Sequence, residues 1–126
     1  MSRILLDTHA VLWAFQGSSE LSTKALKLIN DPDTEIFVSP ISAYELALKA
    51  NLGRLPSLPK DFSSLAKEAG FGILPITAAH FELAGKLPLI NRDLWDRLLS
   101  AQAIVESIPL ISCDANIAGL GAEIIW

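Results

Sequence analysis

The chain has 126 residues, which is enough for one domain of ordinary size and too few for two. Hydrophobic residues make up 51% of it and charged residues only 19%, a balance that predicts apolar surface available to a partner. The net charge of −4, without a basic tract, excludes a nucleic-acid binder that relies on its own positive charge, unless bound cations reverse the local field.

Neither the apolar stretches nor the cysteine content points to a membrane or an oxidising compartment. No uninterrupted apolar run approaches the roughly 18 residues that a membrane span needs, and Asp7 and His9 interrupt the apolar N-terminal segment. The single cysteine, Cys113, has no partner for an internal disulfide and is expected to be a small core residue. We therefore expect a soluble, cytoplasmic protein.

Short apolar runs alternate with segments of helical spacing along the chain, and turn residues separate them. The first half predicts a strand at residues 3–7, a helix at 11–15 with Thr8 as its N-cap, a helix at 21–29, a strand at 35–39 and a helix from Pro40 to Gly53. The second half predicts a helix at 60–69, a strand at 72–76, a helix at 77–87, a helix at 93–107, a strand at 109–112, a short helix at 114–120 and a strand at 123–126.

This alternation of strands and helices determines the expected fold class. Strands that are joined through helices need crossover connections, which produce a parallel sheet with helices on both faces. The run Ile4-Leu5-Leu6 fits such a sheet, because a strand buried on both faces needs no polar alternation. We expect a three-layer α/β/α sandwich with a central, mainly parallel sheet, formed by residues 1–126 as a single domain.

Two acids stand directly after expected strands. Asp7 follows the first strand and Asp114 the fourth, and in open parallel sheets ligands bind outside the carboxyl ends of the strands. Each acid can also be explained as the N-cap of the helix that follows it. The sheet brings strand ends to one edge, so the joint placement of the acids is more informative than either position alone.

Glu45 lies on the apolar stripe of its expected helix, together with Ile41, Leu48 and Leu52. A buried carboxylate must be paired or must bind a cation, because an isolated buried charge costs several kcal/mol. Lys49, four residues later, offers a salt bridge. The residue pattern alone leaves the salt bridge and a metal site as equal alternatives.

Asp93 and Asp96 occupy the first turn of the expected helix at 93–107, where the helix dipole favours acids. Together with the earlier acids they form a set of oxygen ligands without a His–Cys cluster. Such a set suits hard cations such as Mg²⁺ or Mn²⁺, which bind phosphates, better than zinc. The pattern therefore indicates metal-dependent hydrolysis of phosphodiester bonds, in which the metal activates a water.

Four motifs, in this order and at this spacing, resemble those of VapC-type PIN domains, the toxins of bacterial toxin–antitoxin pairs. The resemblance covers nearly the whole chain and includes its last three residues. It implies a PIN-like fold and an RNA-cleaving enzyme. The motifs are residues 5–13, residues 38–49, residues 91–103 and residues 110–114.

The resemblance also implies site residues and partners. Asp7, Glu45, Asp96 and Asp114 match the acids that bind Mg²⁺ or Mn²⁺ and catalyse hydrolysis, and Ser112 matches the hydroxyl residue that supports the last of them. The implied partners are an RNA substrate and a cognate antitoxin that neutralises the enzyme. A homodimer is expected as well, since twofold association is the commonest way to bury surplus apolar surface.

Other polar residues are expected to support the site or the fold. Asp93 falls outside the motif match. His9 and Arg97 lie beside the acids in the sequence and are expected at the surface or next to a carboxylate. His80 is expected to be exposed or hydrogen-bonded.

Three other classes of protein share parts of this pattern. A haloacid-dehalogenase-like phosphatase needs a second acid at the position of His9. A response-regulator receiver domain needs an acid after the third strand and a late lysine, whereas Thr77 stands there and Lys86 is the last lysine. A PIN-like RNA- or protein-binding module without catalysis is expected to lack some of the four acids. That module and a housekeeping PIN nuclease remain as alternatives.

Overall fold

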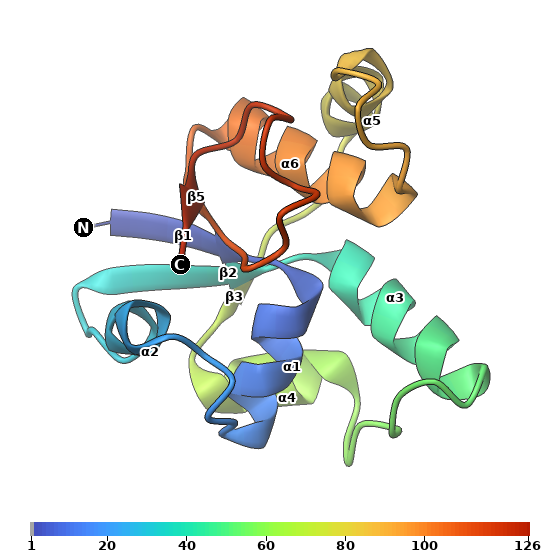
Figure 1. Ribbon diagram of the computed structural model, residues 1–126. Coiled ribbons are helices and arrows are strands. Elements are labelled where there is room, and N and C mark those ends of the chain that lie inside the picture. The colour runs from blue at the N-terminus through green and yellow to red at the C-terminus, as the bar shows by residue number, and fades with distance from the viewer. Residues whose placement is uncertain (1) are drawn as a thin grey trace.

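The computed structural model describes residues 2–126, which form a five-stranded sheet between two layers of helices (Figure 1). The strand order is β3-β2-β1-β4-β5, and every neighbouring pair is parallel. The expected α/β/α sandwich is therefore confirmed. The strands are β1 (Ser2–Leu6), β2 (Thr34–Val38), β3 (Gly72–Ile73), β4 (Leu110–Ile111) and β5 (Ile124–Ile125).

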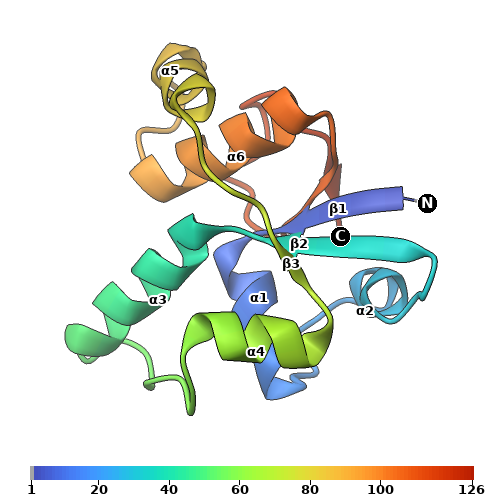
Figure 2. The same cartoon turned by 180° about the vertical axis from the view of Figure 1, so that it is seen from behind.

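Within residues 2–126, six helices connect these strands. In Figures 1 and 2, α5 and α6 lie on one side of the sheet and α1, α2 and α4 on the other, while α3 contacts both α1 and α6. None of these helices is both long and apolar enough to cross a membrane. The helices are α1 (Thr8–Gln16), α2 (Thr23–Ile29), α3 (Pro40–Asn51), α4 (Phe62–Ala69), α5 (Ala78–Lys86) and α6 (Leu94–Glu106).

The central strand β1 divides the hydrophobic core into two clusters. Side chains along a strand point alternately to its two faces, so the neighbours Leu5 and Leu6 are both fully buried but in different clusters. Leu5 packs in the cluster of α6 with Leu99, and Leu6 packs in the cluster of α1 with Val11. Burial on both faces explains the unbroken apolar run of this strand.

Two expected elements are shorter or different in the structure. The strand expected at residues 72–76 ends at Ile73, since Pro75 has no N–H with which to continue the ladder beside β2. The short helix expected at residues 114–120 is wrong: this segment forms turns whose hydrogen bonds span three residues, from Ile117 N–H to the Asp114 carbonyl and from Leu120 N–H to the Ile117 carbonyl. No α-helical ladder develops there.

Two residues were expected as alternative caps of α1, Thr8 and Asp7, and the structure has Asp7. Asp7 is the N-cap, because its Oδ1 accepts a hydrogen bond from the Ala10 N–H at 2.8 Å, and Thr8 is the first helical residue. The Thr8 hydroxyl lies 3.0 Å from the Ser42 hydroxyl of α3. The first acid of the expected site is thus fixed by the helix that it starts.

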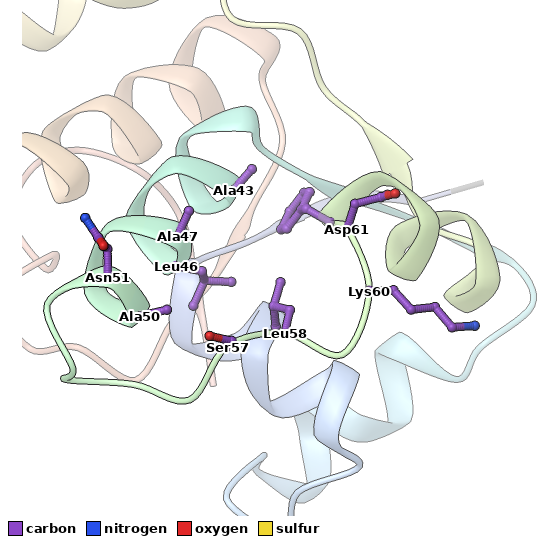
Figure 3. A pocket seen from close by; sticks show the side chains of 10 residues that line it. Ala43, Leu46, Ala47, Ala50, Asn51, Ser57, Leu58, Lys60 and Asp61 are labelled. Carbon is purple, nitrogen blue, oxygen red and sulfur yellow. The ribbon is translucent and has the colours of Figure 1, made fainter.

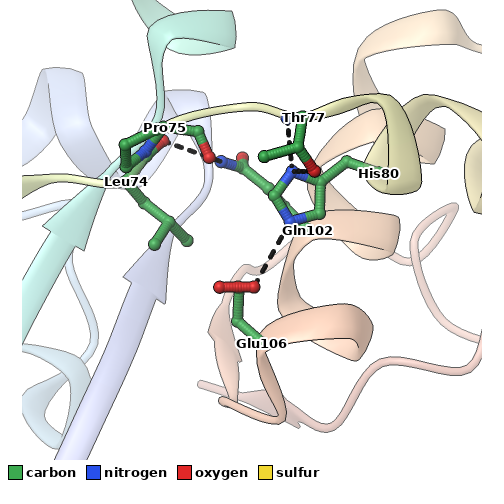
Figure 4. A network of polar contacts seen from close by, with 6 residues as sticks. All are labelled: Leu74, Pro75, Thr77, His80, Gln102 and Glu106. Carbon is green, nitrogen blue, oxygen red and sulfur yellow. Dashed lines mark hydrogen bonds and ion pairs between the residues drawn. The ribbon is translucent and has the colours of Figure 1, made fainter.

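Polar side chains hold the segment that crosses from β3 to α5, which Figure 2 shows passing beside α6. Buried Gln102 donates from Nε2 to the carbonyls of Leu74 at 2.8 Å and Pro75 at 3.3 Å (Figure 4). His80 accepts a hydrogen bond from the Thr77 N–H at Nδ1, at 2.9 Å. Of its two expected environments, His80 is hydrogen-bonded and not exposed. Cys113 is exposed, contrary to expectation, because it lies where the chain leaves β4 for the surface.

Candidate active site

The carboxyl edge of the sheet carries a cleft of about 170 Å³. Asp7 reaches this cleft from the end of β1, Asp114 from the segment after β4, Glu45 from α3 and Asp96 from the first turn of α6. These positions are far apart in the sequence, and the parallel sheet brings them together because its strands all end at one edge. The structure therefore places all four predicted acids at a single cleft.

Asp7 is the most enclosed of the four acids, with 4% of its surface exposed. Burial raises the pKa of Asp7, and the Ser112 hydroxyl, the Ala10 N–H and the nearby His9 oppose this shift. His9 itself is exposed and packs against Trp13, with 5.5 Å between the ring centroids. A largely buried carboxylate at the end of the central strand is in a suitable position to bind a cation.

Glu45 is buried as its position in the helix predicts, with 6% of its surface exposed. Ile41, on the same predicted apolar stripe, is buried too, but Leu52 is 55% exposed at the end of α3. Lys49 Nζ donates to Glu45 Oε2 at 2.6 Å, so the salt bridge is present. This ion pair occupies one carboxylate oxygen, and Glu45 still lines the cleft.

Asp96 and Asp114 are held by neighbouring amide groups. Asn91 Nδ2 donates to Asp96 Oδ2 at 2.9 Å, and the Asn116 N–H donates to Asp114 Oδ1 at 2.9 Å. Ser112 Oγ accepts from the Asp114 N–H at 3.1 Å, a contact that fixes the backbone of the last acid. Burial raises the pKa of Asp96 to about 6, with further repulsion from Asp93, Asp114 and Glu45, while the bond from Asn91 opposes the shift.

The remaining polar residues of the site have structural contacts. Asp93 is the N-cap of α6 and accepts from the Asp96 N–H at 3.0 Å, as expected for a residue at a helix start, and it also lines the cleft. Arg97, expected at the surface or next to a carboxylate, is instead buried and donates to backbone carbonyls. Asn91 also lines the cleft, and sequence reasoning gave it no role. Its position two residues before Asp93 is the one available signal, since Asn at that spacing often closes a local turn.

The donor set fits a hard divalent cation. Each acid uses one oxygen in a hydrogen bond or ion pair, and among residues 2–126 the second oxygen of Glu45, Asp96 and Asp114 has no protein donor. In the same part of the chain, no three Asp, Glu, His or Cys side chains lie close enough to enclose one cation directly. Mg²⁺ does not require such a group, because it commonly binds through one or two carboxylates while it retains several waters.

The raised pKa of Asp96 predicts a pH-dependent effect on stability. Below pH 3.8, the ordinary pKa of an aspartate, the Asp96 carboxyl is protonated in both the folded and the unfolded chain. Because its pKa is raised to about 6 in the folded chain, the metal-free fold loses stability as the pH rises from 3.8 through about 6. Asp96→Asn should therefore raise the melting temperature by a few degrees in EDTA at pH 7.5, and the gain should disappear at pH 4. Thermal melts at both pH values check this, and an equal gain at both would contradict it.

A larger cavity, of about 550 Å³, lies apart from the acids between α3 and the segment before α4 (Figure 3). Small and apolar side chains of α3, such as Ala43, Leu46 and Ala47, form one wall, and Leu58 lies opposite. Lys60, at its edge, pairs with Glu68. We call this cavity the α3–α4 groove. Its lining suits an apolar partner and not a hydrolytic reaction.

The fold and the cleft together define a class: a parallel α/β domain with carboxylates from four segments at the carboxyl edge of its sheet. The family model described as the PIN domain matches residues 4–122. The chain therefore belongs to the PIN domain family, as its motifs indicate. No curated protein sequence matches it significantly.

Several solved structures with the same fold are described as VapBC or toxin–antitoxin complexes. VapBC2 from Rickettsia felis, bound to a promoter DNA fragment, is 18% identical with a TM-score of 0.66, over 98% of this chain and 97% of that one. A toxin–antitoxin complex from Klebsiella pneumoniae is 20% identical with a TM-score of 0.66, over 98% and 96%. VapBC-5 from Mycobacterium tuberculosis is 15% identical with a TM-score of 0.60, over 99% and 97%. At these identities the likeness establishes the fold.

Proposed function

We propose that this protein is a metal-dependent endoribonuclease that acts as the toxin of a toxin–antitoxin pair. The observation that carries the proposal is the cleft at which Asp7, Glu45, Asp96 and Asp114 lie together. Membership of the PIN family supports nuclease chemistry, and the similar structures described as VapBC or toxin–antitoxin complexes support the toxin role. A binding module without catalysis has no need for four acids at one cleft.

In this proposal the four acids hold Mg²⁺ or Mn²⁺ and each is kept in place by a neighbouring group. When bound, the cation supplies Lewis-acid activation of water and stabilises negative charge on the phosphoryl group. Asp7 is fixed by the first turn of α1, and Glu45 is oriented by Lys49. Ser112 fixes the backbone of Asp114. No side chain needs to form a covalent bond with the RNA.

The proposed antitoxin would use both the cleft and the apolar surface. An arginine side chain can bind two carboxylate oxygens at once, so a guanidinium inserted among the acids would compete with both the cation and the RNA. The α3–α4 groove offers apolar surface for the rest of such a partner (Figure 3). Such an antitoxin would inhibit the enzyme by occupying the acidic cleft.

We also propose that the protein forms a homodimer in the cytoplasm. Tyr44, 59% exposed, packs against Trp95 with 5.2 Å between their ring centroids. Leu94, the residue before Trp95, is 56% exposed. An exposed apolar cluster on α3 and the start of α6 is the kind of surface that twofold association buries.

Expression in a bacterial host tests the toxin role directly. The wild-type protein alone is expected to arrest growth, and Asp7→Asn is expected to allow it. Co-expression of the reading frame adjacent to its gene is expected to restore growth, and the two proteins should purify as one complex. Normal growth at high expression of wild type, with no adjacent product that binds, would contradict the toxin role and leave a housekeeping PIN nuclease.

A further inference from the structure

The connection between α5 and α6, residues 87–93, borders the acidic cleft, and we call it the strap. Arg97, only 8% exposed, holds its backbone. Nη1 of Arg97 donates to the carbonyls of Pro88 at 2.7 Å and Asn91 at 2.8 Å. Nη2 donates to the carbonyls of Ala84 at 2.7 Å and Leu87 at 2.8 Å. Three of these charge-assisted hydrogen bonds hold backbone carbonyls of the strap, and the fourth holds the last turns of α5 beside it.

Within the strap, the Asn91 side chain connects three segments of the chain. Its Nδ2 donates to Asp96 Oδ2 at 2.9 Å and to the backbone carbonyl of Asn116 at 2.6 Å. Its Oδ1 accepts from the Asp93 N–H at 2.8 Å. One amide group thus joins the strap, the first turn of α6 and the segment that follows Asp114.

These contacts determine which way the amide is oriented. Both partners of Nδ2 are acceptors, a carboxylate and a carbonyl, and the partner of Oδ1 is a donor. A flipped amide would place its oxygen against two acceptors and its hydrogens against an N–H, so only the observed orientation satisfies all three. The Asn91 amide is therefore held between the turn of α6 that carries Asp96 and the segment that follows Asp114.

From this geometry we propose that Asn91 is the positioning residue of the metal site. It holds Asp96 Oδ2, which leaves Oδ1 of that carboxylate without a donor among residues 2–126, and through the Asn116 carbonyl it holds the turn that carries Asp114. The two acids come from different elements, α6 and the segment after β4, and Asn91 sets the distance between them. This inference rests on the proposed function, since it assigns Asn91 a role toward a cation held by those acids.

The structure indicates that Asn91 can be changed without loss of the fold. Every bond from Arg97 to the strap ends on a backbone carbonyl, and none depends on the Asn91 side chain. Asn91→Ala removes all three side-chain contacts. Asn91→Ser is the milder second variant, because a serine hydroxyl can still accept from the Asp93 N–H while it cannot replace both amide donors. Asn30→Ala, at the end of α2 and away from the cleft, is the matched control.

Calorimetric titration of metal-free protein with Mn²⁺ measures the first expected effect. Groups that orient metal ligands typically contribute about 10- to 100-fold to metal affinity, so Asn91→Ala should bind Mn²⁺ more weakly by about that factor. Asn91→Ser should show an intermediate loss and Asn30→Ala none. Cleavage by Asn91→Ala should recover as the Mn²⁺ concentration is raised, a rescue that a folding defect would not show.

Hydrogen exchange of the metal-free proteins measures the second effect, which needs no activity. Amides of residues 112–118 should exchange faster in Asn91→Ala than in wild type, because the Asn116 carbonyl loses its donor. Asn91→Ala that binds Mn²⁺ as tightly as wild type, or that shows unchanged hydrogen exchange in residues 112–118, would overturn the role of Asn91 and leave the proposed function standing. A wild-type protein that binds no Mn²⁺ or Mg²⁺ would overturn both the metal site of the proposed function and this inference.

Discussion

Replacement of Asp7 with Asn is expected to reduce RNA cleavage by more than about 100-fold and to leave the fold intact. Groups that merely orient metal ligands contribute about 10- to 100-fold, and a ligand itself should contribute more. The fold should survive because Asn is as good an N-cap as Asp, and its side-chain oxygen can still accept from the Ala10 N–H. The variant removes the charge at nearly constant shape.

The measurement is cleavage of RNA at saturating Mg²⁺ or Mn²⁺, with circular dichroism to verify folding. Asp31→Asn is a matched control, since Asp31 Oδ1 also accepts from a backbone N–H, that of Asp33 at 2.8 Å, in an exposed turn. This control should cleave RNA as the wild type does. Retained activity in a folded Asp7→Asn protein would remove Asp7 from the site.

Glu45→Gln is expected to reduce cleavage by more than about 100-fold on the same reasoning, whereas Lys49→Met, which removes only a group that orients Glu45, should lose less than that and keep measurable cleavage. The two residues form one ion pair, so a purely structural role would make the two variants similarly mild. Lys49 contacts only Oε2, and the proposed function uses the carboxylate charge of Glu45 at the cleft. A difference between the variants is therefore the signature of a role beyond the salt bridge.

Cleavage rates and melting temperatures of both variants test this prediction. Lys49→Met should lower stability, since it leaves a nearly buried carboxylate without its cation, and added Mn²⁺ should restore part of the loss. Equal cleavage by both variants would mean that Glu45 serves only the ion pair. Equal loss by both would place Lys49 in the reaction as well.

Much of the fold could be predicted because the relevant signals are local. The apolar run ending at Leu6, the Ser39-Pro40 start of α3 and the alternation of strands with helices each reflect the preferences of neighbouring residues. The errors occurred where a short segment has no dominant local signal. Residues 114–120 have helical spacing but form turns, and Gly119 and Gly121 adopt positive φ values of 89° and 112°, outside the helical region.

For the candidate site, the sequence could identify the acids but not the contacts that hold them. Asp7, Asp114 and Glu45 could be singled out because they follow strands or lie on an apolar helix face, and the resemblance to PIN domains added Asp96 in place of Asp93. The contacts that hold them depend on three-dimensional proximity. Asn91 meets Asn116 across 25 positions of the chain, and Arg97 meets carbonyls up to 13 positions away. No pattern in the sequence marks those pairs, so the proposed positioning role of Asn91 could come only from the structure.

The most direct test of the account is incubation of the purified protein with total cellular RNA, followed by mapping of the cleaved ends. The proposed function predicts cleavage with Mg²⁺ or Mn²⁺, none in EDTA and none by Asp7→Asn under any of these conditions. Intact RNA at saturating concentrations of both metals would contradict the account. So would cleavage that persists in EDTA and is unchanged in Asp7→Asn, because the acidic cleft would then have no part in it.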